Sequence, residues 1–160
     1  MADVRLEQWG EEDAGLLAEL NGDPEQMAHV GGAETAEKIA ERQERYVRDP
    51  GCFVVVDELG DHVGWVGFWE REWNGGTVYE AGWSIHKRAQ GRGYASKATM
   101  LLVEAAKAAG VRELHAFPGV GNAPSNRVCE RAGFTLVQPD LAFEYPPGHT
   151  MRCNDWALTL

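Results

Sequence analysis

The chain has 160 residues, 44% of them hydrophobic and 25% charged, and its formal net charge is −10. These values are typical of one globular domain with a real core, and the acidity disfavours general nucleic-acid binding, which depends on a basic surface. The longest apolar runs, Cys52–Val56 and Met100–Val103, are far shorter than the roughly 20 residues of a membrane span.

The three cysteines are widely spaced and form no CxxC pair. We therefore expect reduced thiols in a cytoplasmic protein, with no disulfide framework, no metal site and no membrane partner. The acidic balance suits a cationic substrate such as an amine.

The first part of the chain predicts one strand followed by helices. The expected elements are a strand from Val4, a helix carrying Leu16, Leu17 and Leu20, a short helix around Met27 and Val30, and a charged helix over Thr35–Arg48.

The middle of the chain predicts an antiparallel set of three strands, at Cys52–Asp57, His62–Arg71 and Thr77–Ile85. Asn74-Gly75-Gly76 is a strong hairpin signal between the second and the third.

The last part of the chain predicts a helix–strand–helix–strand–strand order. The expected elements are a helix over Tyr94–Ala109, a strand over Arg112–Phe117, a short helix begun by Pro124, and strands at Phe134–Val137 and Trp156–Leu160. A strand, a crossover helix and a further strand imply one parallel pair. We expect an α+β fold (an α/β sandwich), with a mixed, mostly antiparallel sheet of about six to seven strands flanked by about four helices, in a single domain over residues 4–160.

The segment from Lys87 to Lys97 combines two glycines with basic residues and leads into the amphipathic helix. No Asp or Glu occurs between Glu80 and Glu104. A Gly-rich turn that opens a helix exposes backbone N–H groups at the positive end of the helix dipole. This pattern predicts a phosphate-bearing ligand, although a tight turn alone would also require glycine.

Two other phosphate motifs fit this turn less well. A Walker loop needs Gly-Lys-Ser/Thr after four spacers, which the sequence lacks. A dinucleotide fingerprint of a nucleotide-dependent oxidoreductase has Gly or Ala at the position of Ser96 and an acidic residue near Glu113. This dinucleotide fingerprint normally follows the first strand of a parallel βαβ unit, whereas an antiparallel meander precedes the Gly-rich turn of this chain.

The sequence resembles the GNAT superfamily of N-acetyltransferases from about Val4 to Leu160. Arg88–Gly93 matches the acyl-CoA signature Gln/Arg-x-x-Gly-x-Gly/Ala, and Asn122–Phe134 resembles the segment Asn-x-x-Ser followed by Glu-Lys-x-Gly-Phe. Trp9–Asp13 and Asn21–Met27 look like the Rim-type branch of ribosomal-protein N-terminal acetyltransferases.

The resemblance implies acetyl-CoA as co-substrate and no metal. Pantetheine would lie between Thr77–Ile85 and Arg112–Phe117, which splay apart. Arg88, Arg92 or Lys97 would reach outer phosphates. Asn122 would bond the pantetheine arm, although it equally suits a helix N-cap. The implied cofactor-binding residues are Trp83, Ser84, Ile85, Arg88, Gln90, Gly91, Arg92, Gly93, Tyr94, Ala95, Ser96, Asn122 and Asn126.

The reaction implied is acetyl transfer to a primary amine, which needs a base and an acid. Glu80 is the first candidate base. Its alternative role is that of a solvated strand residue or a cross-strand partner. The other candidate bases are Glu70, Glu72 and His86. Many family members have Tyr as the acid, but Cys129 takes that position and suits a small core residue. Ser125 is the candidate acid. Its alternative role is a hydrogen bond from its hydroxyl to the local backbone.

The acceptor is expected to be an amine-bearing small molecule or a peptide or protein N-terminus. Trp65, Trp69 and Trp73 share one strand face by their spacing, and Tyr145–His149 would lie near the acceptor mouth. A homodimer is a further expectation from the fold. The alternative to an enzyme is a non-catalytic acyl-CoA-binding regulatory module, since the family's usual Tyr is missing and several residues compete as the base.

Overall fold

A computed structural model describes residues 3–144 and 147–160 of the chain. The strands are β1 (Val4–Gln8), β2 (Cys52–Asp57), β3 (His62–Trp73), β4 (Gly76–Ile85), β5 (Glu113–Ala116), β6 (Thr135–Glu144) and β7 (Thr150–Thr159). The helices are α1 (Ala14–Asn21), α2 (Ala36–Arg48), α3 (Tyr94–Ala108) and α4 (Ala123–Arg131), with single 3-10 turns η1 (Glu11–Asp13) and η2 (Lys87–Ala89).

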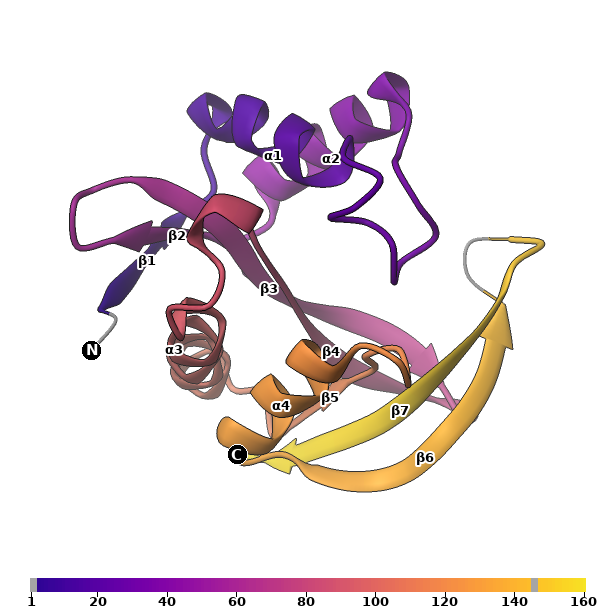
Figure 1. Ribbon diagram of the computed structural model, residues 1–160. Helices are drawn as coiled ribbons and strands as arrows, with labels where there is room; N and C mark the ends of the chain where they lie inside the picture. The colour runs from indigo at the N-terminus through magenta and orange to yellow at the C-terminus, as the bar shows by residue number, and fades with distance from the viewer. Residues whose placement is uncertain (1–2, 145–146) are drawn as a thin grey trace.

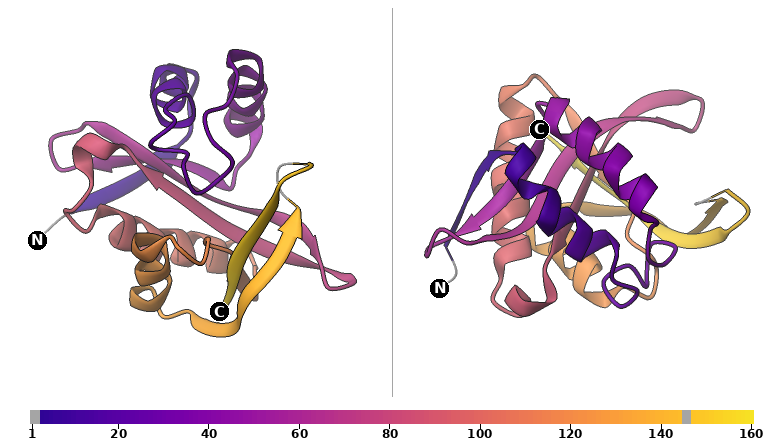
Figure 2. Two further views of the ribbon diagram at one scale, coloured as in Figure 1. Left: turned by 45° about the vertical axis from the view of Figure 1, so that its right-hand side comes forward. Right: turned by 90° about the horizontal axis from the view of Figure 1, so that it is seen from above.

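The strands form one seven-stranded sheet in the order β1-β2-β3-β4-β5-β7-β6. Helices α1 and α2 cover one face of this sheet, and α3 and α4 cover the other (Figures 1 and 2). We call these the α1 face and the α3 face. The mixed α+β fold expected from the sequence is confirmed. None of the helices in the described ranges is both long and apolar enough to cross a membrane.

Each face of the sheet has its own buried core. In β2, Val54 and Val56 belong to the cluster that packs under α1 and α2, and Val55 belongs to the cluster under α3. This alternation follows from the period of two along a strand. The strongly apolar run of β2 therefore reflects a strand that is covered on both sides.

Strands β4 and β5 form the one parallel pair of the sheet, as the crossover through α3 predicts. Their paired residues are Tyr79 with Leu114 and Glu80 with His115. Beyond these, β4 continues to Ile85, whereas β5 ends at Ala116 and the chain turns toward α4. We call the opening between residues 81–85 and residues 116–121 the fork. It is the splayed pair that the sequence predicts.

Two expected elements differ in the structure. The short helix around Met27 is absent: residues 24–31 form turns, in which the Met27 carbonyl accepts from both Val30 N (3.1 Å) and Gly32 N (2.9 Å). Gly31 and Gly32 both have positive φ, 96° and 88°, so a regular helix cannot propagate through them.

The last two strands are longer than the sequence suggested, since β6 reaches Glu144 and β7 begins at Thr150. Their register shifts between Leu136 and Gln138 and again between Gln138 and Leu141. Asp140 lies in this irregular stretch with a φ of 57°. Such bulges break the alternation of apolar residues that would otherwise reveal a strand.

Candidate functional site

The turn between β4 and α3 has the backbone of an anion site. Gly91 and Gly93 have φ of 79° and 81°, and Gly93 is the N-cap of α3. No side chain among residues 3–144 and 147–160 caps the first turn of this helix. A Cβ placed on Gly91 would meet nothing within 4 Å, so the space beside the turn is open. The N–H groups of the first turn are therefore available to an anionic ligand.

The basic residues around this turn divide into two groups. Lys87 and Arg88 reach the acidic side chains of the N-terminal half: Lys87 Nζ lies 2.8 Å from Asp23 Oδ2 and Arg88 Nη1 lies 3.8 Å from Glu19 Oε2. The hydrogen bond from Lys87 lowers the pKa of Asp23. Arg92 is exposed at the turn and has no ion pair within the described chain.

The end of β4 is tied to the loop between α1 and α2 (residues 22–35), which we call the α1–α2 loop. Gln26 Nε2 donates to the Ile85 carbonyl at 2.8 Å, and Gln26 Oε1 accepts from Lys87 N at 3.1 Å. The Ile85 carbonyl also accepts from Gln90 Nε2 at 2.9 Å. Gln90, one of the residues expected to bind the cofactor, therefore shapes the turn.

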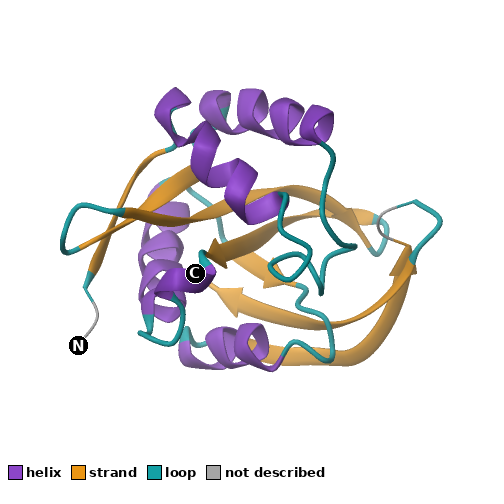
Figure 3. Cartoon of the chain, turned by 45° about the horizontal axis from the view of Figure 1, so that its top comes forward, coloured by secondary structure: helices purple, strands orange, loops and turns teal. Residues whose placement is uncertain are grey.

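The α1–α2 loop also approaches the other side of the fork. A Cβ on Gly119 would lie 3.9 Å from the His29 carbonyl oxygen. The loop thus meets β4 at one end and the segment after β5 at the other (Figure 3). It spans the fork on the α1 face.

The two asparagines of α4 have structural partners. Asn122 caps the helix, and its Oδ1 accepts from Ser125 N at 3.3 Å. Asn126 Nδ2 donates to the carbonyls of Gly119 (2.9 Å) and Asn122 (2.8 Å). Its Oδ1 also accepts from Asn154 and Trp156, at 2.8 and 2.9 Å. A cofactor contact by Asn126 would therefore have to replace one of these bonds.

The remaining candidate residues of β4 and α4 differ in how deeply they are buried. Trp83 packs against the core of the α3 face, and Ser84 Oγ lies 3.4 Å from Gln26 Nε2. Ser125 is half-buried in the first turn of α4. Cys129 is 0% exposed within the core of the α3 face, and burial raises the pKa of its thiol to about 12. Cys129 is therefore a core residue, and it offers no proton to a ligand.

Glu80 lies at the fork and is mostly buried. Arg71 Nη1 donates to Glu80 Oε1 at 2.7 Å, and the two side chains are only 22% and 19% exposed. Burial raises the pKa of Glu80, while Arg71, Trp69 and His115 oppose that rise. Glu80 is thus a cross-strand partner of β3, and the reading as a solvated strand residue is wrong. A partly buried carboxylate of raised pKa suits a general base.

The alternates to Glu80 lie elsewhere. Glu70 and Glu72 are exposed, and they accept hydrogen bonds from Tyr79 Oη (3.3 Å) and Thr77 Oγ1 (2.9 Å). Their alternation with Arg71 along β3 puts them on the opposite face of the sheet from Glu80. His86 caps η2, and its Nε2 lies 3.3 Å from Glu19 Oε2.

Aromatic side chains surround Glu80 on the α1 face. A Cβ on Gly82 would lie 2.5 Å from Trp69 and 3.2 Å from Trp65, so these rings share the face of Gly82 and Glu80. Trp73 packs against Phe117 with the rings tilted by 57° and their centroids 4.7 Å apart, and the Arg71 guanidinium lies 4.4 Å from the centre of Phe117. The expected shared face of the tryptophans is confirmed.

Sequence reasoning missed the residues that complete this cluster. His115 lies between two carboxylates: Nδ1 is 2.7 Å from Asp155 Oδ1 and Nε2 is 2.8 Å from Glu113 Oε1. Burial would lower the pKa of His115, but both carboxylates outweigh it and raise that pKa. The available signal was a charged residue, Asp155, on the strand face that it shares with Cys153 and Ala157.

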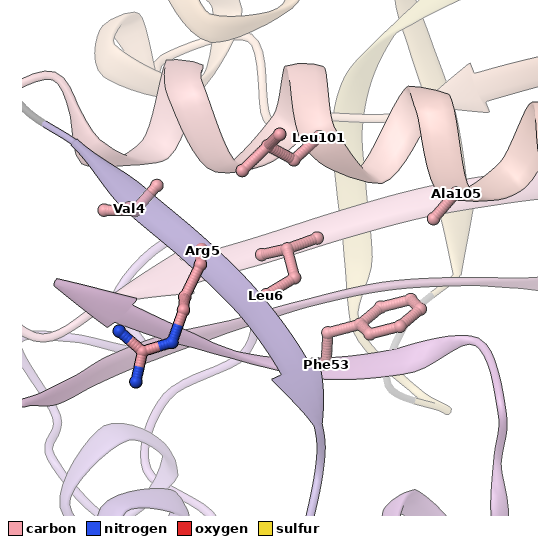
Figure 4. Close-up of a pocket in the computed structure, with 6 residues that line it drawn as sticks. All are labelled: Val4, Arg5, Leu6, Phe53, Leu101 and Ala105. Atoms are coloured by element: carbon pink, nitrogen blue, oxygen red, sulfur yellow. The ribbon is translucent and has the colours of Figure 1, made fainter. Parts of the chain in front are cut away.

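Two cavities accompany these elements. One of about 330 Å³ opens beside the fork and is lined by Ala28, His29, Gly31, Gly119, Val120, Gly121, His149, Thr150, Met151 and Arg152. Tyr145 and Pro146 of the expected mouth loop lie outside the described residues. The other, about 350 Å³, is an apolar groove between β1, β2 and α3, lined by Val4, Arg5, Leu6, Phe53, Leu101 and Ala105 (Figure 4). No group of three potential metal ligands occurs in the described ranges.

Comparison with known proteins gives one family. Residues 3–135 match the family model described as an acetyltransferase (GNAT) domain. A search among curated proteins found no match to the sequence.

Solved structures share the fold at low sequence identity. A GNAT-family acetyltransferase from Bacillus anthracis has a TM-score of 0.81 and 22% identity, over 99% of this chain and 96% of that one. Spermidine N-acetyltransferase from Vibrio cholerae, solved with CoA and spermine, has a TM-score of 0.79 and 18% identity, over 98% and 95%. Aminoglycoside acetyltransferase AAC(6')-Ib, solved with coenzyme A, has a TM-score of 0.72 and 21% identity, over 98% and 95%.

Proposed function

The chain belongs to the GNAT acetyltransferase family, and from that premise we propose that it transfers an acetyl group from acetyl-CoA to a primary amine. One observation carries the proposal. Strand β4 presents Glu80 at the fork and then leads directly into the Gly91–Gly93 turn, so a base and an anion site stand at two points of one continuous segment.

The donor side of the site fits a pyrophosphate. The Gly91–Gly93 backbone and the first turn of α3 would hold it, and Arg92 would add positive charge near the phosphates. The open space beside Gly91 leaves room for the group. When bound, acetyl-CoA supplies a thioester that an amine can attack.

On the acceptor side of the site, the amine must lose a proton and the leaving sulfur must gain one. A primary amine is protonated at neutral pH and must lose a proton before its nitrogen can attack. Glu80 takes that proton, directly or through water, since burial makes its carboxylate a stronger base than an exposed one. Ser125 Oγ is our candidate donor to the leaving sulfur, because Cys129 is enclosed in the core.

The acceptor we propose is a small-molecule amine or the N-terminus of a peptide. Spermidine N-acetyltransferase and aminoglycoside acetyltransferase, two proteins of the same fold, are named for amine substrates. The Rim-type resemblance of Trp9–Asp13 and Asn21–Met27 supports the peptide N-terminus. The cavity of about 330 Å³ beside the fork is the proposed entrance for either.

Calorimetry of CoA binding tests the donor site. Gly91→Asp puts a carboxylate beside the proposed phosphate position and should weaken CoA binding by at least about tenfold. Gly110→Asp is the matched control, since Gly110 also has a positive φ (89°) and open space but follows the far end of α3. Both variants bear similar backbone strain, so equal losses of CoA affinity would contradict the assignment.

A turnover assay with a panel of polyamines, aminoglycosides, amino acids and peptides tests the chemistry. Glu80→Gln should lower kcat/KM by about 10²–10⁴-fold while CoA affinity stays unchanged. CoA binding without turnover on any acceptor would instead support the non-catalytic module. Full activity of Glu80→Gln would remove Glu80 as the base.

A further inference from the structure

The cluster at the fork contains a histidine that the proposed reaction does not yet use. Glu80 and His115 are the last paired residues before β4 and β5 separate. The His115 ring stacks on Phe117, with an interplanar angle of 12° and centroids 5.8 Å apart. Phe117 in turn lies against Arg71, the hydrogen-bond partner of Glu80. The histidine and the carboxylate therefore belong to one packed group.

The two ring nitrogens of His115 determine its charge. A neutral imidazole donates from one nitrogen only, while a carboxylate only accepts. Both nitrogens of His115 face a carboxylate oxygen, at 2.7 and 2.8 Å, so both bonds form only if the ring is an imidazolium. His115 is 8% exposed and Asp155 is 3% exposed, so water screens the His115–Asp155 pair little.

The titratable groups around Glu80 come from three strands. Arg71 comes from β3, His115 and Glu113 come from β5, and Asp155 and Cys153 come from β7. Two of them are cations close to Glu80. The carboxylate of Glu113 is 54% exposed and is screened by water, whereas that of Asp155 is 5% exposed and lies 2.7 Å from His115 Nδ1.

We propose that His115, held as an imidazolium by Asp155 and Glu113, is a positioning residue that keeps Glu80 ionised and ready to accept a proton. The role rests on the proposed function, in which Glu80 is the base. Burial alone would favour the protonated carboxyl, which cannot accept a proton. Arg71 and His115 together restore the carboxylate, and His115 itself neither gains nor loses a proton during the reaction.

NMR titration of the protein without ligands tests the electrostatic part. In ¹⁵N-histidine spectra, both His115 nitrogens should stay protonated well above the ordinary histidine pKa of about 6.5. In ¹³C-glutamate spectra, with the Glu80 signal assigned through Glu80→Gln, His115→Gln should raise the pKa of Glu80 by about one unit or more. An unchanged Glu80 pKa, or an ordinary His115 titration, would overturn the proposal.

Three further variants separate charge from structure. His115→Lys returns a cation and should reverse most of the shift in the Glu80 pKa. Asp155→Asn should lower the pKa of His115, because it removes the carboxylate at Nδ1, and it keeps the imidazolium testable if His115→Gln fails to fold. His62→Gln is the matched control, because His62 is also paired with a buried aspartate, Asp13, but lies at the start of β3. It should leave the Glu80 pKa unchanged.

The pH dependence of kcat/KM then separates this inference from the proposed function. The acid limb in His115→Gln should move to higher pH by the same amount as the Glu80 pKa, with activity recovering at high pH. A uniform loss of activity at every pH would indicate a merely structural role and overturn the proposal. A shifted Glu80 pKa in a protein with no acetyl transfer would support the electrostatic role and refute Glu80 as a base.

Discussion

Glu34 is a buried carboxylate that fixes the α1–α2 loop to α2. Its side chain is 6% exposed, and it accepts from Arg42 Nη2 at 2.7 Å and from Asn21 Nδ2 at 2.8 Å. Burial would raise the pKa of Glu34, but the bonds from Arg42, Asn21 and Lys38 outweigh burial and lower it. We expect Glu34→Gln to reduce the free energy of unfolding by about 1–3 kcal/mol at pH 7.

The size of this effect depends on pH. A carboxyl whose folded pKa is lowered contributes stability above its unfolded pKa and loses it as the pH falls through the folded value. The difference between wild type and Glu34→Gln should therefore shrink below about pH 4.5, as urea unfolding at several pH values would measure. Glu44→Gln, which removes an exposed partner of Arg48, should cost under about 0.5 kcal/mol. A cost for Glu34→Gln that is constant down to pH 3 would contradict this account.

Individual residues differed in how far the sequence revealed them. Glu80 could be named because it sits in a recognisable segment, and Cys129 could be assigned to the core because a small apolar residue suits a buried helix face. Arg71, His115 and Asp155 could not be grouped with Glu80 in advance. They come from three strands, and alternation gives the face of each residue but not the register that brings them together.

The α1–α2 loop is tied to the end of β4 by a side chain whose role the sequence alone does not reveal. Gln26 makes two hydrogen bonds with the backbone at the end of β4. Gln26→Ala should therefore release the loop locally, and the amides of residues 24–32 should exchange hydrogen about tenfold faster, since two such bonds contribute about 1–3 kcal/mol. Hydrogen exchange followed by mass spectrometry would measure this.

The matched control for Gln26 is another glutamine. Gln8 Nε2 donates to the Pro50 carbonyl at 3.1 Å, far along the sheet from the fork. Gln8→Ala should leave the exchange of the α1–α2 loop unchanged. If both variants speed amide hydrogen exchange in the α1–α2 loop equally, or if neither does, Gln26 does not anchor the loop.

Elements with regular periodicity were predictable, and irregular ones were not. Helix α3 has a clear helical period, and β2 to β4 are apolar stretches bounded by turn residues, so their positions and order were expected correctly. The sequence could not reveal β6 beyond Val137, because Asp140 adopts a positive φ and the register slips around it. The turns at residues 24–31 look helical by composition, but the two following glycines stop helix propagation.

At the scale of the whole molecule, one sheet carries two separate cores. Leu17 lies in the core of the α1 face and Leu102 in the core of the α3 face, and both are 0% exposed. Consecutive residues of β2 alternate between these cores, so loosening either one disturbs a strand that the other needs. The two layers should therefore unfold together, as parts of one cooperative unit.

Calorimetry of two core variants tests this coupling. Leu17→Ala and Leu102→Ala should each reduce the free energy of unfolding by about 2–5 kcal/mol, because each deletes a fully buried side chain and leaves a cavity. Each should lower the midpoint of a single transition whose calorimetric and van't Hoff enthalpies agree. If Leu17→Ala instead separates an early transition of α1 and α2 from a later one, that layer is an independent unit. The layer on the α1 face could then open without unfolding the layer on the α3 face.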